Sequence, residues 1–265
     1  MTRHDAGWAL GMLLLAAALA LLPHRLPGEA SGMLSLITAD EVETISFVDN
    51  GTASADLKPT VQNRQQATLL FGMETEPVIA GDVAEKWTRT KAAIDRELDA
   101  VAQCRANDVC SPAAHKLIDL SASGNGRTGR ASVGLINRAV DLAISPASDE
   151  AQWGVPDHWS APFETLQSSR GDCEDYATLK YLALRAAGFS GDDVKIVILK
   201  NVFPNEDHAA VAVRVEGEWL ILDNRTLTLV RDTDLTRAIP RFVLDQQGAR
   251  RFVWASRKPR GAAGT

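Results

Sequence analysis

Apolar residues recur at helical spacing in three stretches of the sequence. Residues 82–104 and 132–144 each gather their apolar side chains on one face, which predicts two amphipathic packing helices. Ser145–Pro146 should end the second helix, because proline disfavours helical geometry in the residue before it. A third helix is expected from Cys173, and Gly188 stands where a glycine commonly caps the carboxyl end.

Runs typical of β-strands follow the third helix. Three strands are predicted, at Val194–Lys200, Ala209–Val215 and Trp219–Asp223. Glu216–Gly217 predicts a two-residue hairpin turn between the last two strands, so that Ala210 would face Asp223.

Strand alternation brings a histidine and an acid together. Side chains along a strand point alternately to its two faces, so His208, Ala210 and Ala212 should share a face with Asp223. His208 and Asp223 are then diagonal neighbours with Cα atoms about 7–8 Å apart, within reach of a side-chain hydrogen bond. The small side chains of Ala210 and Ala212 would let the Cys173 helix pack closely on that face.

The amino terminus has the features of an export signal. A stretch without charges runs from Trp8 to Leu22, which is short for a membrane-spanning helix of about 20 residues. Gly28 and Ala30 suit cleavage by signal peptidase after residue 30. We interpret residues 1–30 as a signal peptide that directs the chain to the periplasm. The alternatives are an uncleaved inner-membrane anchor and a buried core helix.

Composition and charge narrow the class of protein. The chain has 265 residues, of which 45% are hydrophobic, and a net charge of −6. This is enough apolar material for one large domain, and the acidic balance argues against nucleic-acid binding. We expect one domain over 31–250, with short strands and surface loops over 31–80, and a flexible basic tail over 251–265.

The three cysteines have different expected roles. Five residues separate Cys104 from Cys110, which permits a disulfide, and an oxidising compartment favours one. Zinc is less favoured there, because no second pair of ligands is evident. Pairing these two leaves Cys173 as the single free thiol, which in an exported protein indicates reactivity.

Cys173 at a helix start has the setting of a nucleophile. Unpaired backbone N–H groups and the positive end of the helix dipole favour its thiolate. Cysteine proteases, transglutaminases and some acyltransferases add a histidine that exchanges protons and a group that orients it, roles that His208 and Asp223 fit. The alternative is that Cys173 and His208 are ordinary structural residues and that Asp223 is a turn residue.

Three carboxylates flank the thiol, at Asp172, Glu174 and Asp175. They would raise the pKa of Cys173, against the needs of a nucleophile. A bound hard cation would remove this conflict, and calcium takes about six to eight oxygen ligands and is abundant outside the cytoplasm. Carboxylates at a helix start also act as dipole partners without a metal, so both explanations remain open.

The motif GDCEDYA at Cys173 and the later stretch DHAAVAVRVEGEWLILDNRT resemble the bacterial transglutaminase-like cysteine proteinases, which include the LapG-type adhesin-cleaving proteases. The resemblance is strong over about residues 153–226. It implies a papain/transglutaminase-like α+β fold, in which Cys173 on a helix packs on an antiparallel sheet carrying His208 and Asp223.

The same resemblance implies a cofactor and partners. The family's calcium site matches Asp172, Glu174 and Asp175. For the adhesin-cleaving members, it implies a giant surface adhesin as the substrate, and so an effect on biofilm attachment. It also implies an inner-membrane receptor for cyclic di-GMP that sequesters the protease.

The favoured function is a calcium-dependent cysteine endopeptidase with Cys173, His208 and Asp223 as its catalytic triad. The backbone N–H of Cys173 would stabilise the oxyanion, and Trp159 is a candidate for the second donor. Acyl transfer to an amine by the same triad is one alternative. A non-catalytic envelope module that binds calcium and a protein partner is another.

Overall fold

The computed structural model describes residues 69–254. The predicted signal peptide at 1–30 therefore lies outside the described residues, as do residues 31–68 and 255–265. Among the residues described, no helix has both the length and the apolar character needed to span a membrane.

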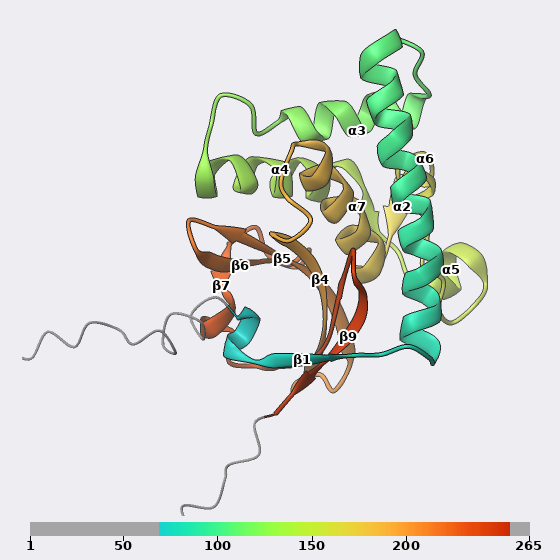
Figure 1. Ribbon diagram of the computed structural model, residues 1–265. Coiled ribbons are helices and arrows are strands. Elements are labelled where there is room, and N and C mark those ends of the chain that lie inside the picture. The colour runs from blue at the N-terminus through green and yellow to red at the C-terminus, as the bar shows by residue number, and fades with distance from the viewer. Residues whose placement is uncertain (1–68, 255–265) are drawn as a thin grey trace, which may run out of the picture. The chain divides into compact units, whose positions relative to one another are not determined.

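Within residues 69–254, seven strands form one antiparallel sheet in the order β1-β9-β8-β4-β5-β6-β7 (Figure 1). The strands are β1 (Glu74–Pro77), β4 (Val194–Asn201), β5 (Asp207–Val215), β6 (Glu218–Leu222), β7 (Val230–Arg231), β8 (Ala238–Asp245) and β9 (Gly248–Val253). Two short 3₁₀ helices, η1 (Leu70–Gly72) and η2 (Asp232–Asp234), meet where the backbone N–H of Phe71 donates to Asp232 Oδ2 at 2.5 Å. Because η1 precedes β1 and η2 follows β7, this contact links the two edges of the sheet.

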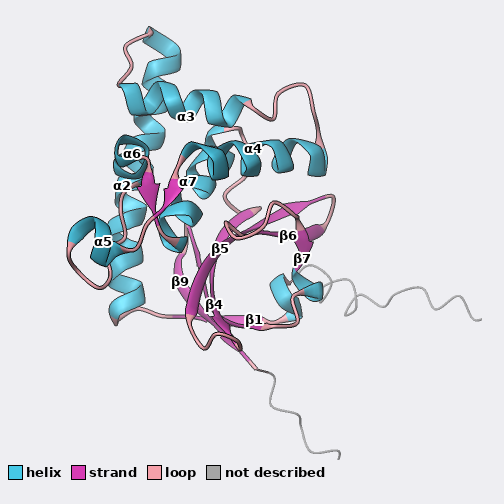
Figure 2. Ribbon diagram, turned by 180° about the vertical axis from the view of Figure 1, so that it is seen from behind, coloured by secondary structure: helices cyan, strands magenta, loops and turns pink. Residues whose placement is uncertain are grey.

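The helices gather on one side of this sheet, as both views show (Figures 1 and 2). They are α2 (Asp82–Asn107), α3 (Pro112–Ala122), α4 (Gly129–Ala143), α5 (Asp149–Trp153), α6 (Pro162–Ser168) and α7 (Cys173–Ala186). Helix α7 packs on β4 and β5, and α2, α3, α4 and α6 contact it from the other sides. A short parallel pair, β2 (Ser145–Pro146) and β3 (Arg170–Gly171), leads into α7. This is the α+β architecture expected from the sequence.

The three helices predicted from periodicity are present. Helix α2 runs three residues beyond the predicted 82–104, and α4 ends just before Ser145–Pro146. Helix α7 ends at Ala186 and is capped, as expected, by Gly188, whose φ of 98° is left-handed and whose N–H donates to Arg185 O at 3.0 Å. The N–H of Phe189 donates to Leu184 O at 3.1 Å, which completes a Schellman cap.

The predicted hairpin has the predicted register. Val215 pairs with Glu218, and Val211 pairs with Leu222. Glu216 and Gly217 form the turn with φ values of 54° and 85°, the left-handed pair that matches the twist of a two-residue hairpin.

The face of β5 that meets α7 differs from the prediction. Helix α7 packs with the core that contains Ala209, Val211 and Val213, whereas Ala210 and Ala212 belong to a second apolar cluster on the opposite face. Both faces of β5 are buried, so its apolar residues run continuously and do not reveal which face a helix covers.

The carboxyl-terminal strand corrects a predicted boundary. Residues 251–253, assigned from sequence to a flexible tail, form the end of β9, where Phe252 pairs with Thr75 of β1. Phe252 is buried and meets Phe71 edge to face at 5.5 Å. The tail prediction failed here because β9 obtains its partners from β8 and from the distant β1.

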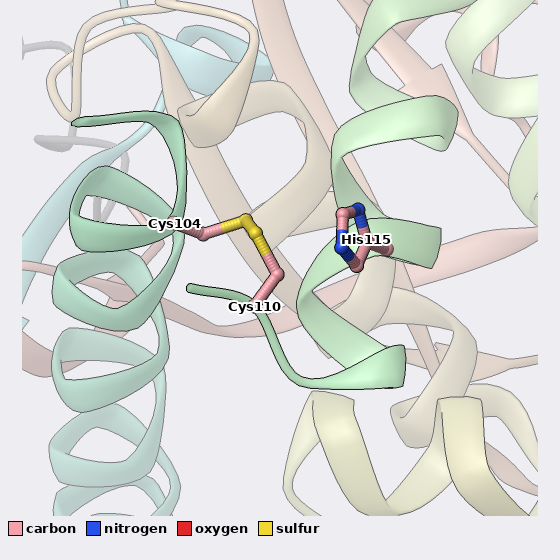
Figure 3. Close-up of side chains that lie close together, drawn as sticks. All are labelled: Cys104, Cys110 and His115. Carbon is pink, nitrogen blue, oxygen red and sulfur yellow. A yellow bond between two sulfur atoms is a disulfide. The ribbon is translucent and has the colours of Figure 1, made fainter. Parts of the chain in front are cut away.

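Cys104 and Cys110 form a disulfide between the end of α2 and the start of α3 (Figure 3). Their Cα atoms lie 4.7 Å apart, and Cys104 is buried. His115 of α3 lies near the two sulfur atoms, but the sulfurs are bonded to each other rather than available to a metal. Cys173 is the free cysteine of the chain.

Candidate active site

Cys173 is the first residue of α7, and Asp172 precedes the helix as its N-cap. The Cys173 thiol donates to Glu174 Oε2 at 3.0 Å. Burial, followed by the charge of Glu174, raises the pKa of Cys173 well above its usual range, while a backbone hydrogen bond from Ala209 acts in the opposite direction. Burial and the flanking carboxylates thus both favour the protonated thiol, and the effect of the carboxylates is the conflict expected from the sequence.

His208 and Asp223 lie side by side, as strand alternation predicted. His208 Nε2 is 3.0 Å from Asp223 Oδ1, and His208 is only 5% exposed. Asp223 also accepts from Arg225, with Nη2 to Oδ2 at 2.8 Å and the backbone N–H to Oδ1 at 2.9 Å. Burial disfavours the charged carboxylate, but hydrogen bonds from His208 and Arg225 outweigh it and keep the pKa of Asp223 below its usual range.

A cleft of about 200 Å³ brings the two halves of the site together. Cys173 and His208 both line it, with Trp159 and Ala209 beside them. Because Nε2 of His208 faces Asp223, Nδ1 is the nitrogen left for exchange with the thiol. The arrangement has the parts needed for nucleophilic attack on a carbonyl group, namely a thiol, an imidazole and an ionised orienting acid.

The three predicted metal ligands lie within a larger acidic cluster. We define this cluster as Asp149, Asp157, Asp172, Glu174 and Asp175. Carboxylate oxygens of Asp149, Asp172 and Asp175 lie within 4.8 Å of one another, and so do those of Asp149, Asp157 and Glu174.

Asp149 and Asp157 were not identified from the sequence. Asp149 opens the short helix α5 after the capping residue Ser148, and it is 4% exposed. The signal available in the sequence was an acid that directly follows the capping residue Ser148, but nothing local indicated that this segment returns to Cys173. Arg225 was also missed, although it stands two residues after Asp223.

The cluster contains buried carboxylate oxygens that have no hydrogen-bond partner among the described residues. Asp175 is fully buried, its Oδ1 accepts from the backbone N–H of Ser160 at 2.9 Å, and its Oδ2 has no hydrogen-bond partner among the described residues. Asp172 Oδ1 is likewise buried and unpaired in this part of the chain. Burial and the charge of Glu174 raise the pKa of Asp172 to about 9, and burial raises that of Asp175 to about 7.

These residues fit a hard divalent cation. All the donors are carboxylate oxygens, two of them buried and unpaired, and such a set suits calcium rather than a softer metal. The absence of a side chain at Gly171 leaves room for the Asp175 carboxylate, because a Cβ atom at position 171 would lie 2.5 Å from Asp175 Oδ2.

Comparison with solved structures gives low-identity neighbours. LapG of Legionella pneumophila is 19% identical and aligns over 59% of this chain and 86% of its own, with a TM-score of 0.46. Its calcium-bound structure aligns over the same shares at 20% identity and a TM-score of 0.46. Its EGTA-treated structure aligns over 57% and 80% at 19% identity and a TM-score of 0.44.

The match to a protein family establishes the family of this chain. No curated protein sequence matches the chain. Residues 101–260, more than half of the chain, match the family described as bacterial transglutaminase-like cysteine proteinase. That segment contains the thiol, the His208–Asp223 pair and all five acids of the cluster. The chain belongs to the bacterial transglutaminase-like cysteine proteinases.

Proposed function

We propose that this protein is an exported, calcium-dependent cysteine endopeptidase in which Cys173, His208 and Asp223 form the catalytic triad. The observation that carries the proposal is the shared cleft, which Cys173 and His208 both line, together with the 3.0 Å distance between His208 Nε2 and Asp223 Oδ1. The disulfide between Cys104 and Cys110 agrees with export to an oxidising compartment.

In the proposed mechanism, His208 Nδ1 takes the proton of the Cys173 thiol. The sulfur attacks the peptide carbonyl carbon, and the imidazolium then gives its proton to the leaving amine. Water hydrolyses the resulting thioester with His208 as the base, which frees the new carboxyl terminus and Cys173. Asp223 orients the ring throughout and stabilises its charged form.

Two donors are proposed for the oxyanion. The backbone N–H of Cys173 lies at the first turn of α7, where N–H groups have no intrahelical partner. Trp159 lines the cleft beside Cys173, and its indole N–H is the proposed second donor. Such donors stabilise the charge that develops on the carbonyl oxygen in the transition state.

Calcium is proposed at the acidic cluster, with Asp172, Glu174 and Asp175 as ligands. Asp149 and Asp157 are further candidate ligands, because their carboxylate oxygens lie within 4.8 Å of each other and of Glu174. A bound divalent cation would offset the negative charge beside the thiol and so favour its thiolate. The support is the oxygen-only donor set and the two buried, unpaired carboxylate oxygens.

The proposed substrate is a large surface adhesin, and the proposed regulator is an inner-membrane receptor for cyclic di-GMP that sequesters the protease. Both rest on the adhesin-cleaving members of the family. Cleavage of an adhesin would release cells from surfaces, which links the protein to biofilm attachment.

The test is cleavage of an adhesin segment encoded by the same organism, with calcium or with a chelator. We expect cleavage with calcium only, and loss of at least a thousandfold in rate for Cys173→Ala and His208→Gln. His115→Gln is the matched control, since this histidine is exposed and lies beside the disulfide.

Other outcomes identify which part of the proposal is wrong. Unchanged cleavage by Cys173→Ala would contradict the assignment of Cys173 as the nucleophile. Cleavage that is insensitive to chelator would contradict the proposed calcium dependence. A peptide–amine adduct formed with an added primary amine, in place of new free termini, would indicate acyl transfer rather than hydrolysis.

A further inference from the structure

Lys86 is a cation placed inside the catalytic cleft. It lies near the start of α2, lines the cleft together with Cys173, and its side chain is 14% exposed. Its Nζ is 2.7 Å from Asp82 Oδ2 and also forms an ion pair with Asp157 Oδ2. The nucleophile and this ammonium group therefore open onto the same space.

Asp157 connects this lysine to the acidic cluster. Its carboxylate oxygen lies within 4.8 Å of the carboxylates of Asp149 and Glu174, which also belong to the cluster. The Lys86 ammonium therefore lies against the outer side of the group of acids whose inner side contains the buried, unpaired Asp175 Oδ2. A cation that binds Asp157 must share this carboxylate with Lys86.

We propose that Lys86 is a tethered counter-ion of the acidic cluster that competes with calcium and thereby sets the calcium affinity of the site. This inference rests on the calcium site of the proposed function. Two positive charges that share Asp157 repel each other, and each also reduces the negative charge available to the other. Since such coupling is reciprocal, bound calcium weakens the ion pair between Lys86 and Asp157 by the same free energy.

The position of Lys86 gives this competition a consequence for the cleft. When calcium takes Asp157, Lys86 keeps its contact with Asp82 and faces the cleft beside Cys173. Calcium binding and the charge presented to the substrate are then linked through one side chain.

The test is the calcium affinity of Lys86→Met, measured by titration calorimetry on the full mature chain without any substrate. We expect Kd to fall by about tenfold, because a full charge beside the ligands is removed. Lys86→Arg keeps the charge and should keep Kd within about twofold. Lys91→Met is the matched control, because Lys91 forms its 2.7 Å pair with Asp95 on the same helix and outside the cluster.

The outcomes separate this inference from the proposed function. Equal Kd values for the wild type and Lys86→Met overturn the inference and leave the calcium site standing. Absence of calcium binding by the wild type overturns both. If Lys86→Met does not fold, Lys86→Gln takes its place, and a Kd equal to that of the wild type in that variant overturns the inference in the same way.

Discussion

Gly171 leaves the space that the Asp175 carboxylate occupies. A Cβ atom at this position would lie 2.5 Å from both Cβ and Oδ2 of Asp175, closer than non-bonded atoms approach. Gly171→Ala should therefore displace a ligand of the proposed calcium site and weaken calcium binding by at least tenfold, as measured by calorimetry. Thiol labelling of Cys173 without calcium should change little, because the substitution leaves the helix start in place.

Gly134→Ala is the matched control for that substitution. Its added Cβ would lie 3.7 Å from Leu229 Cδ1, an ordinary contact on α4, so calcium affinity should stay at the wild-type value. Equal weakening in both variants would mean that loss of stability, rather than displacement of Asp175, controls binding.

Strand alternation placed His208 beside Asp223, because side-chain direction along a strand is local geometry. The spacing around Cys173 likewise identified Asp172, Glu174 and Asp175. Asp149 and Asp157 could not be found in this way, since a short helix and an irregular loop carry them to the thiol. The catalytic and metal-binding roles of all these residues remain predictions.

Glu97 of α2 couples two helices through a half-buried carboxylate. Both of its oxygens accept from the backbone N–H of Phe163 in the first turn of α6, at 3.2 Å. Burial raises its pKa from an ordinary 4.5 to about 7. The folded state then binds more protons than the unfolded state across this range, so the free energy of unfolding should fall as pH rises from 4.5 to about 7.

Glu97→Gln keeps an acceptor for Phe163 and removes the charge. Its free energy of unfolding in urea should exceed that of the wild type by less than about 1 kcal/mol at pH 5 and by about 2 kcal/mol at pH 8, after allowance for partial exposure. Glu97→Ala lacks the acceptor and should be less stable than Glu97→Gln at both pH values. The same stability difference between wild type and Glu97→Gln at both pH values would contradict the assigned titration.

Periodicity predicted the long helices and missed the short ones. Helices α5 and α6 have five and seven residues, too few for a repeating apolar face. Helix α3 did carry a signal, because Ser111 caps it and Pro112 is its first residue. Strand β8 contains Pro240, which weakens a strand pattern in the sequence.

Local sequence patterns do not predict the order of the strands in the sheet. The β5–β6 hairpin could be predicted because a two-residue turn fixes its register. The pairing of β1 with β9 joins residues 74–77 to 250–253, and no spacing in the sequence indicates it. This pairing turns a segment that was predicted to be a tail into part of the core.

The β1–β9 pairing predicts where the chain can be shortened. A chain ending at Trp254 keeps every pair of β9, whereas one ending at Arg250 loses Phe252 from the second apolar cluster and three of the four partners of β1. Loss of a buried phenylalanine alone costs about 3–5 kcal/mol, so the shorter chain should melt at least about 10 °C lower by circular dichroism. The chain ending at Trp254 should melt within about 2 °C of the mature protein, since no described pairing is removed. Equal melting temperatures for the two truncated chains would contradict a structural role for residues 251–253 and would support the prediction that they belong to a flexible tail.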